Sequence, residues 1–136
     1  MIKPINHDQT FLAQKSVPAT KADLTIVKDL QDTLAANSAN CVGMAANMIG
    51  VNKDIIVFAL GTLAVPMVNP TIISKSDPYQ TSEGCLSLTG ERSTTRYNNI
   101  TVKYQDVDFN DQTENFSDFI AQIIQHEVDH CNGVII

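Results

Sequence analysis

Apolar residues in the segment 21–37 recur at steps of three and four positions, and aspartates and lysines lie between them. This period places the apolar side chains on one face of a helix and the charged side chains on the other. The pattern therefore predicts an amphipathic helix in the N-terminal part of the chain. Its apolar face consists of Leu24, Val27, Leu30 and Leu34.

Strand-like patterns occupy the middle of the chain. Short runs rich in β-branched residues are separated by turn residues such as Gly61 and Pro70, and the last run alternates between apolar and polar positions. Such runs predict β-strands, and two buried strands explain the uncharged stretch 55–74 better than a transmembrane helix does. The predicted strands span residues 55–59, 65–68, 71–73 and 100–104.

An acidic run follows the last of these strands. Asp106, Asp108 and Asn110 occupy the first, third and fifth positions of a possible calcium loop. However, the glycine required at the sixth position is Asp111, and the glutamate required at the twelfth is Ser117. The run is therefore interpreted as an acidic hairpin turn rather than a calcium site.

Helical spacing returns after Ser117, a residue type that often precedes the first turn of a helix, and continues to about Cys131. At about 100° per residue, four side chains of this segment fall within about 60° of one another. They are expected to form the apolar face that points at the core. The four residues are Phe119, Ile123, His126 and His130.

Composition and charge narrow the classes of protein. The 136 residues are 43% hydrophobic and 18% charged, which fits one globular domain over residues 1–136. A net charge of -6 has the wrong sign for gripping nucleic-acid phosphates, so no nucleic-acid or membrane partner is expected. The three cysteines form no CxxC pair and no stretch suits a signal peptide, so reduced thiols and a cytoplasmic protein are expected. The oligomeric state stays open.

The predicted C-terminal helix contains the sequence HEVDH, in which His126 and His130 are four positions apart and Glu127 follows the first histidine. A single core histidine is usually only hydrogen-bonded. Two histidines one helical turn apart on a buried face can both ligate one divalent ion. The pattern therefore predicts a metal site.

A third ligand must come from elsewhere, because a catalytic divalent ion usually takes three protein ligands. Cys131 lies about 100° further round the helix than His130 and is interpreted as a small core residue. His7 lies in what looks like a loose N-terminal segment. Cys85 is the strongest candidate, since it offers a thiolate and follows the small residue Gly84. One thiolate with two imidazoles suits ferrous iron, cobalt, nickel or zinc.

Three segments resemble the motifs of the peptide deformylases. The sequence EGCLS at 83–87 and the sequence QHEVDH at 125–130 are similar to the paired second and third motifs of that family. The segment 42–50, VGMAANMIG, resembles its glycine-rich first motif. Arg92 and Arg96 fall in a stretch where family members have arginines that support the metal loop. The resemblance covers nearly the whole chain.

The resemblance implies an α+β fold in which antiparallel β-sheets pack around a central, metal-bearing C-terminal helix, together with the N-terminal amphipathic helix. It also implies a reaction. Members of the family remove the formyl group from N-formylmethionyl peptides of nascent chains, usually with Fe(II). The partner implied for this chain is therefore such a peptide or nascent chain.

The resemblance also assigns roles to residues at matching positions. Cys85, His126 and His130 would hold one divalent metal, natively Fe(II), with Zn, Ni or Co as other possible occupants. Glu127 would act as general base and then as general acid. Leu86 would donate its backbone N–H to the carbonyl oxygen of the substrate. The substrate groove would be lined by Val42, Gly43, Met48, Gly84 and Ile123, the last of them in the methionine pocket.

The first motif departs from the family at two positions. Met48 stands where the family has a glutamine whose N–H₂ can bond the reacting oxygen, and a methionine sulfur offers no donor. Loss of one such donor typically costs about 10²–10³ in rate, so reduced activity is expected. Asn47 is expected to point elsewhere. Cys41 stands at the opening glycine, so the loop must avoid a positive φ there or bear strain.

Two functions follow from these features. The first is a metal-dependent amide hydrolase of the deformylase type with reduced activity. The second is a catalytically degenerate paralogue that keeps the metal and uses its groove to bind a peptide or another partner. Glu127 favours the enzyme and Met48 favours the binding protein. The balance favours the enzyme.

Overall fold

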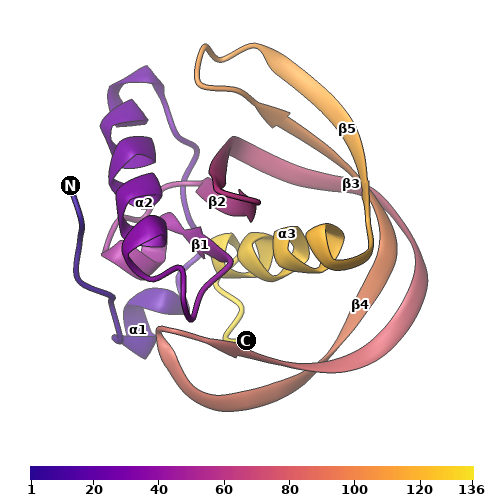
Figure 1. Cartoon of the computed structure of the whole chain (residues 1–136). Helices are drawn as coiled ribbons and strands as arrows, with labels where there is room; N and C mark the ends of the chain where they lie inside the picture. Colours follow the sequence, from indigo (N-terminus) through magenta and orange to yellow (C-terminus); the bar gives the residue numbers. More distant parts are fainter.

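The computed structural model describes residues 1–136 and contains one antiparallel sheet whose five strands pair in chain order (Figure 1). Strands β3 and β4 are much longer than the others and form a hairpin that curves around the molecule. The strands are β1 (Gly43–Ala45), β2 (Ile55–Leu60), β3 (Leu63–Cys85), β4 (Leu88–Gln105) and β5 (Asp111–Ser117). The expected α+β fold with antiparallel strands is confirmed.

Both helices expected from the sequence are present. The N-terminal one consists of the short 3-10 turn η1 (Lys21–Asp23) and helix α2 (Leu24–Ala36), and the C-terminal one is α3 (Asp118–Cys131), which begins directly after Ser117. Two further short elements are α1 (Gln9–Leu12) and the 3-10 turn η2 (Ala46–Ile49). None of the helices combines the length and apolar character that crossing a lipid bilayer requires.

Strand β2 lies between two hydrophobic layers. Ile56 and Phe58 belong to the cluster packed around α3, whereas Ile55 and Val57 belong to the cluster packed against α2. Successive side chains of a strand point to opposite faces, so a strand buried on both faces is apolar at every position. This explains the uninterrupted apolar run at the start of β2. Helix α3 lies inside the curve of the long hairpin (Figure 1).

The long hairpin extends well beyond the predicted strands. The expected segments 65–68 and 71–73 are parts of the single strand β3, and 100–104 is the end of β4. The remainder of the hairpin is largely polar and exposed, so it lacks the apolar alternation that marks a half-buried strand. Beyond β4, the acidic run forms the expected turn to β5, in which Asp106 Oδ1 accepts the backbone N–H of Asp108 and Asn110 at 2.9 and 3.0 Å.

Asn69 marks an irregularity within β3 and has a φ of 51°. Its Oδ1 accepts the N–H of Ala19 at 2.8 Å, and its Nδ2 donates to the carbonyl of Ala19 at 3.1 Å and to Gln105 Oε1 at 2.9 Å. Asparagine tolerates the left-handed region better than most residues. One side chain therefore fixes the bend of β3 and ties the N-terminal segment to β4.

We predict that Asn69→Ala lowers the free energy of unfolding by about 2–4 kcal/mol, because it adds left-handed strain and removes the three side-chain hydrogen bonds. Asn69→Gly removes the bonds but relieves the backbone, so it should cost about half as much. Urea denaturation of the three proteins measures both values. Equal stability of Asn69→Ala and the parent would contradict this role.

Candidate metal centre and active site

Cys85, His126 and His130 converge at the centre of the fold, and their potential ligand atoms all lie within 4.8 Å of one another. The four-residue step on α3 places the two imidazoles one turn apart. Cys85 ends β3, and the curvature of the hairpin returns it to the side of α3. The two Nε2 atoms are 3.1 Å apart. Two imidazoles on one tetrahedral ion would be about 3.3 Å apart, so this donor set fits a single divalent ion.

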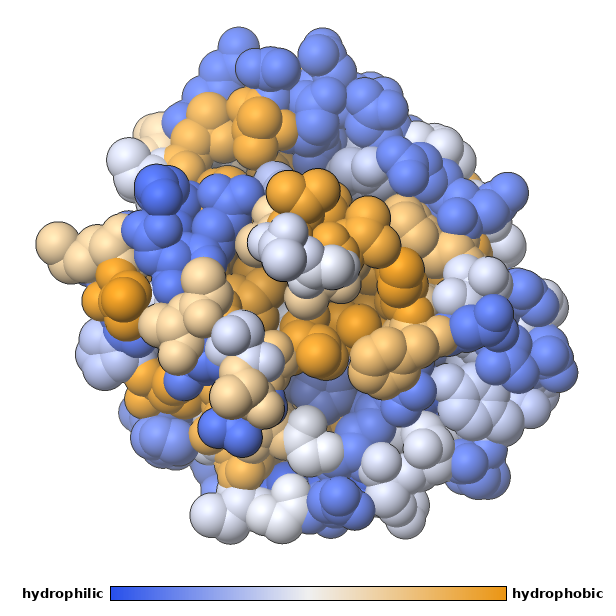
Figure 2. All heavy atoms as spheres, in the orientation of Figure 1, coloured by the Kyte–Doolittle hydropathy of each residue, from blue (hydrophilic) through white to orange (hydrophobic).

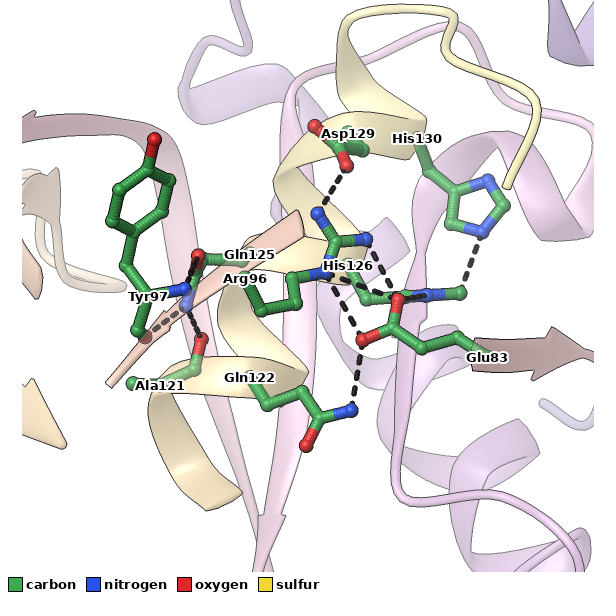
Figure 3. A network of polar contacts seen from close by, with 9 residues as sticks. All are labelled: Glu83, Arg96, Tyr97, Ala121, Gln122, Gln125, His126, Asp129 and His130. Carbon is green, nitrogen blue, oxygen red and sulfur yellow. Dashed lines mark hydrogen bonds and ion pairs between the residues drawn. The ribbon is translucent and has the colours of Figure 1, made fainter. Parts of the chain in front are cut away.

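A cluster of charged residues lies next to the two histidines (Figure 3). The Arg96 guanidinium donates to both carboxylate oxygens of Glu83 at 2.7–3.1 Å and to Asp129 Oδ2 at 2.6 Å. Gln122 Nε2 donates to Glu83 Oε2 at 2.9 Å. The hydrogen bonds from His126, Arg96 and Gln122 outweigh the effect of burial and lower the pKa of Glu83 to about 2. Glu83 is therefore a fixed negative charge beside the metal centre.

Glu83 also orients the first histidine. His126 Nδ1 lies 2.8 Å from Glu83 Oε1, so Nδ1 carries the proton and Nε2 is left to face Cys85 and His130. Burial opposes a charge on His126, but the neighbouring Cys85 thiol and the hydrogen-bonded Glu83 carboxylate raise its pKa to about 10. The second histidine differs, because burial lowers the pKa of His130 to about 3. A neutral imidazole at His130 can offer a ring nitrogen to a metal ion.

Glu127 lies beside the donors with its carboxylate away from water. Its Oε1 is buried and has no hydrogen-bond partner, and burial raises its pKa to about 7. A carboxylate in this state accepts a proton readily near neutral pH. Gly43 makes room for it: a Cβ at this position would lie 2.9 Å from Glu127 Oε2 and 2.7 Å from Ile123 Cγ2. The glycine is required here by close packing.

A pocket with a volume of about 460 Å³ opens beside Cys85, His126 and Glu127. In Figure 2 apolar surface gathers near the middle of the face shown, around the place of α3 in Figure 1. His130 is fully buried and does not line the pocket, so it is the innermost of the three potential metal donors. The other site residues expected from the sequence all line the pocket: Val42, Gly43, Met48, Gly84, Cys85, Leu86, Ile123, His126 and Glu127.

One expectation about α3 is wrong. Phe119 was expected on the face that points at the core, but its side chain is 59% exposed and lies at the rim of the pocket. It occupies the first turn of α3, and the buried residues of the helix begin only at Ala121. The helical period places a side chain on a face, and the extent of the covering sheet decides whether that face is buried.

Other expectations about individual residues hold. Cys131 is a buried core residue outside the donor cluster. Cys41 avoids a positive φ, and its thiol lies 2.9 Å from the carbonyl of Gly43. Asn47 points away from the pocket, because its Nδ2 donates to the carbonyl of His130 at 2.9 Å. Met48 is 1% exposed and lines the pocket with an apolar side chain. The sequence predicts that a hydrogen-bond donor is missing at this position.

Sequence reasoning missed part of the supporting cluster. Arg96, rather than Arg92, reaches Glu83, and Asp129 and Gln122 complete the cluster. Asp129 lies within the HEVDH sequence, so its position beside the ligands was a usable signal. Gln122 carries no such signal. Its role depends on how the hairpin crosses α3, which only the folded chain defines.

Comparison with known proteins agrees with this arrangement. The family model described as polypeptide deformylase matches residues 2–136. A peptide deformylase from Clostridium beijerinckii is 57% identical over 136 residues and covers both chains completely. A peptide deformylase from Chlorobium luteolum is 34% identical over an alignment that covers 99% of this chain and 76% of that protein.

Solved structures show the same fold. A peptide deformylase from Legionella pneumophila superposes with a TM-score of 0.89 at 29% identity, covering 99% of this chain and 83% of that one. A class I type b peptide deformylase from Acinetobacter baumannii, crystallised with bound Met-Ala-Ser, gives 0.88 at 28% identity, with 99% and 97% covered. The chain therefore belongs to the peptide deformylase family of metal-dependent hydrolases.

Proposed function

We propose that residues 1–136 form one metallohydrolase domain that removes the formyl group from N-formylmethionyl peptides, with the metal held by Cys85, His126 and His130. The observation that carries the proposal is the meeting of these three donors, within 4.8 Å, beside the buried and unpartnered carboxylate of Glu127. A Lewis acid next to a proton acceptor is the arrangement that metal-assisted amide hydrolysis requires. The proposed substrate is an N-formylmethionyl peptide or nascent chain, and the proposed site of the reaction is the cytoplasm.

The donor set of one thiolate and two imidazoles suits a metal of intermediate softness. We propose Fe(II) as the native ion, with zinc, nickel and cobalt able to take its place. A divalent ion bound there would supply Lewis acidity, which would polarise the formyl group and make a water molecule easier to deprotonate. The buried Glu83 carboxylate fixes the ring orientation of His126 and thereby prepares the centre for the ion.

The chain's own residues then handle the proton and the substrate. Glu127 removes a proton from the attacking water and later delivers it to the nitrogen of the leaving amine. The backbone N–H of Leu86 stabilises the negative charge that develops on the formyl oxygen. The backbone groups of the groove hold the peptide, and Ile123 packs on the methionine side chain. The groove residues are Val42, Gly43 and Gly84.

Met48 limits the rate in this proposal. Its thioether cannot donate a hydrogen bond, so the developing negative charge has one donor fewer than in a motif that carries glutamine. The deformylase activity is therefore reduced but retained. A second candidate function, peptide or partner binding without catalysis, rests on the same residue, because an apolar wall beside the metal favours binding over charge stabilisation.

We predict that Glu83→Gln weakens metal affinity about 10- to 100-fold, the usual effect of removing a group that orients a metal ligand. The neutral amide cannot pair with Arg96 and bonds His126 less strongly. Chelator competition measures the affinity. Glu91→Gln, an exposed change on the same hairpin, is the matched control and should leave affinity unchanged. An unchanged affinity in Glu83→Gln would remove Glu83 from this role.

We predict that Glu127→Gln reduces formate release by about 10²–10⁴-fold while one metal stays bound per chain, because the carboxylate moves protons and is not a ligand. Formate production and elemental analysis on the same preparation test both parts. If metal is lost together with activity, Glu127 has been given the wrong role.

Met48→Gln restores the missing donor. It should raise kcat/KM on a formyl-methionyl peptide by about ten- to a thousandfold, the range expected for one oxyanion donor. Met48→Leu adds no donor and should leave the value near that of the parent. If neither Met48→Gln nor its combination with Cys41→Gly gains activity in folded, metal-loaded protein, the reduced-deformylase proposal fails and the binding function gains weight.

A further inference from the structure

The N-terminal segment contacts both loops that border the active site. The backbone N–H of Asn6 donates to the carbonyl of Met48 at 2.7 Å, and Asn6 Nδ2 donates to the carbonyl of Asn47 at 3.1 Å. The next residue reaches the other loop, because His7 Nδ1 lies 3.1 Å from the carbonyl oxygen of Ser87. A carbonyl only accepts, so Nδ1 carries the proton in this contact.

The two contacted loops carry opposite sides of the pocket. Asn47 and Met48 belong to η2, whereas Leu86 and Ser87 form the turn between β3 and β4. In Figure 1 the tip of this long hairpin lies close to α1. No other hydrogen bond of the structure joins η2 to this turn. The pair Asn6–His7, here called the N-terminal clamp, is therefore their hydrogen-bonded link.

Hydrogen bonds to the start of α1 hold the N-terminal clamp in place. Asn6 Oδ1 accepts the backbone N–H of Asp8 at 3.1 Å, and Asp8 Oδ1 caps α1 by accepting from Thr10 N and Phe11 N. Leu12, at the end of α1, is fully buried. Because these contacts hold the segment in place, it can keep η2 and the turn between β3 and β4 at a fixed distance. A frayed terminus could not do so.

We propose that His7 and Asn6 are positioning residues of the deformylase reaction, which set the distance between η2 and the Leu86 N–H across the pocket. This inference rests on the proposed role of Leu86 as the oxyanion donor. Because Met48 supplies no hydrogen-bond donor, the position and direction of the Leu86 N–H have a larger effect on the rate. Small displacements of a catalytic group cost large factors in rate. The clamp acts from outside the pocket, through the Ser87 carbonyl.

The test compares three substitutions at His7 with a neighbouring control in the metal-loaded full chain. His7→Ala removes the donor and should lower kcat on a formyl-methionyl peptide about tenfold, with KM, metal content and Tm near the parent's values. His7→Asn places an amide N–H close to the position of Nδ1 and should restore kcat to within about twofold. His7→Gln places it further out and should not. Gln9→Ala, exposed and without side-chain bonds, is the control.

Hydrogen exchange of the segment 85–88 provides a readout that needs no turnover. Exchange of these amides should accelerate about tenfold in His7→Ala and return to the parent's rate in His7→Asn. Parent-like kcat and exchange in His7→Ala would overturn the inference. So would a loss of metal or Tm that His7→Asn does not restore, because that result indicates a general structural role. A metal-loaded parent that releases no formate would instead refute the proposed function, and the exchange result would still decide the clamp.

Discussion

The contact of the buried Arg96 guanidinium with buried Glu83 and half-buried Asp129 is the constraint on which the rest of the structure depends. Charges removed from water must be paired, and breaking such a pair typically costs about 3–5 kcal/mol. Here the pairing fixes the hairpin against α3, since Glu83 comes from β3 and Asp129 from the helix. Cys85 lies two residues beyond Glu83, so the same contact that aligns the two elements also places the thiol beside the imidazoles.

The site also contains groups whose arrangement opposes stability. The carboxylate of Glu127 is buried with an unpartnered oxygen, and Gly43 leaves room for it by having no side chain. An unsatisfied buried carboxyl destabilises a fold unless the surroundings hold it in place. In this chain the double packing of β2 against α2 and α3 supplies that support. The two hydrophobic layers on either side of β2 thus stabilise the fold, and the unpartnered carboxylate of Glu127 lies beside them.

Periodicity and local motifs predicted the parts of the molecule that depend on nearby residues. Helices α2 and α3, the apolar strand β2 and the convergence of His126 and His130 all follow from short-range spacing. The polar, exposed parts of β3 and β4 were not predicted, because they pair with each other and do not pack on the core. The exposure of Phe119, the contact of Gln122 with Glu83 and the clamp at His7 depend on where distant segments meet, which no local pattern encodes.

The central claim is that the fold prepares a mixed thiolate and imidazole centre from Cys85 and the two histidines of α3. X-ray absorption at the metal edge of the anaerobically purified, iron- or nickel-loaded protein tests it most directly. The account predicts a first shell with one sulfur and two imidazole nitrogens. A shell without sulfur, or one with a single imidazole, would contradict it.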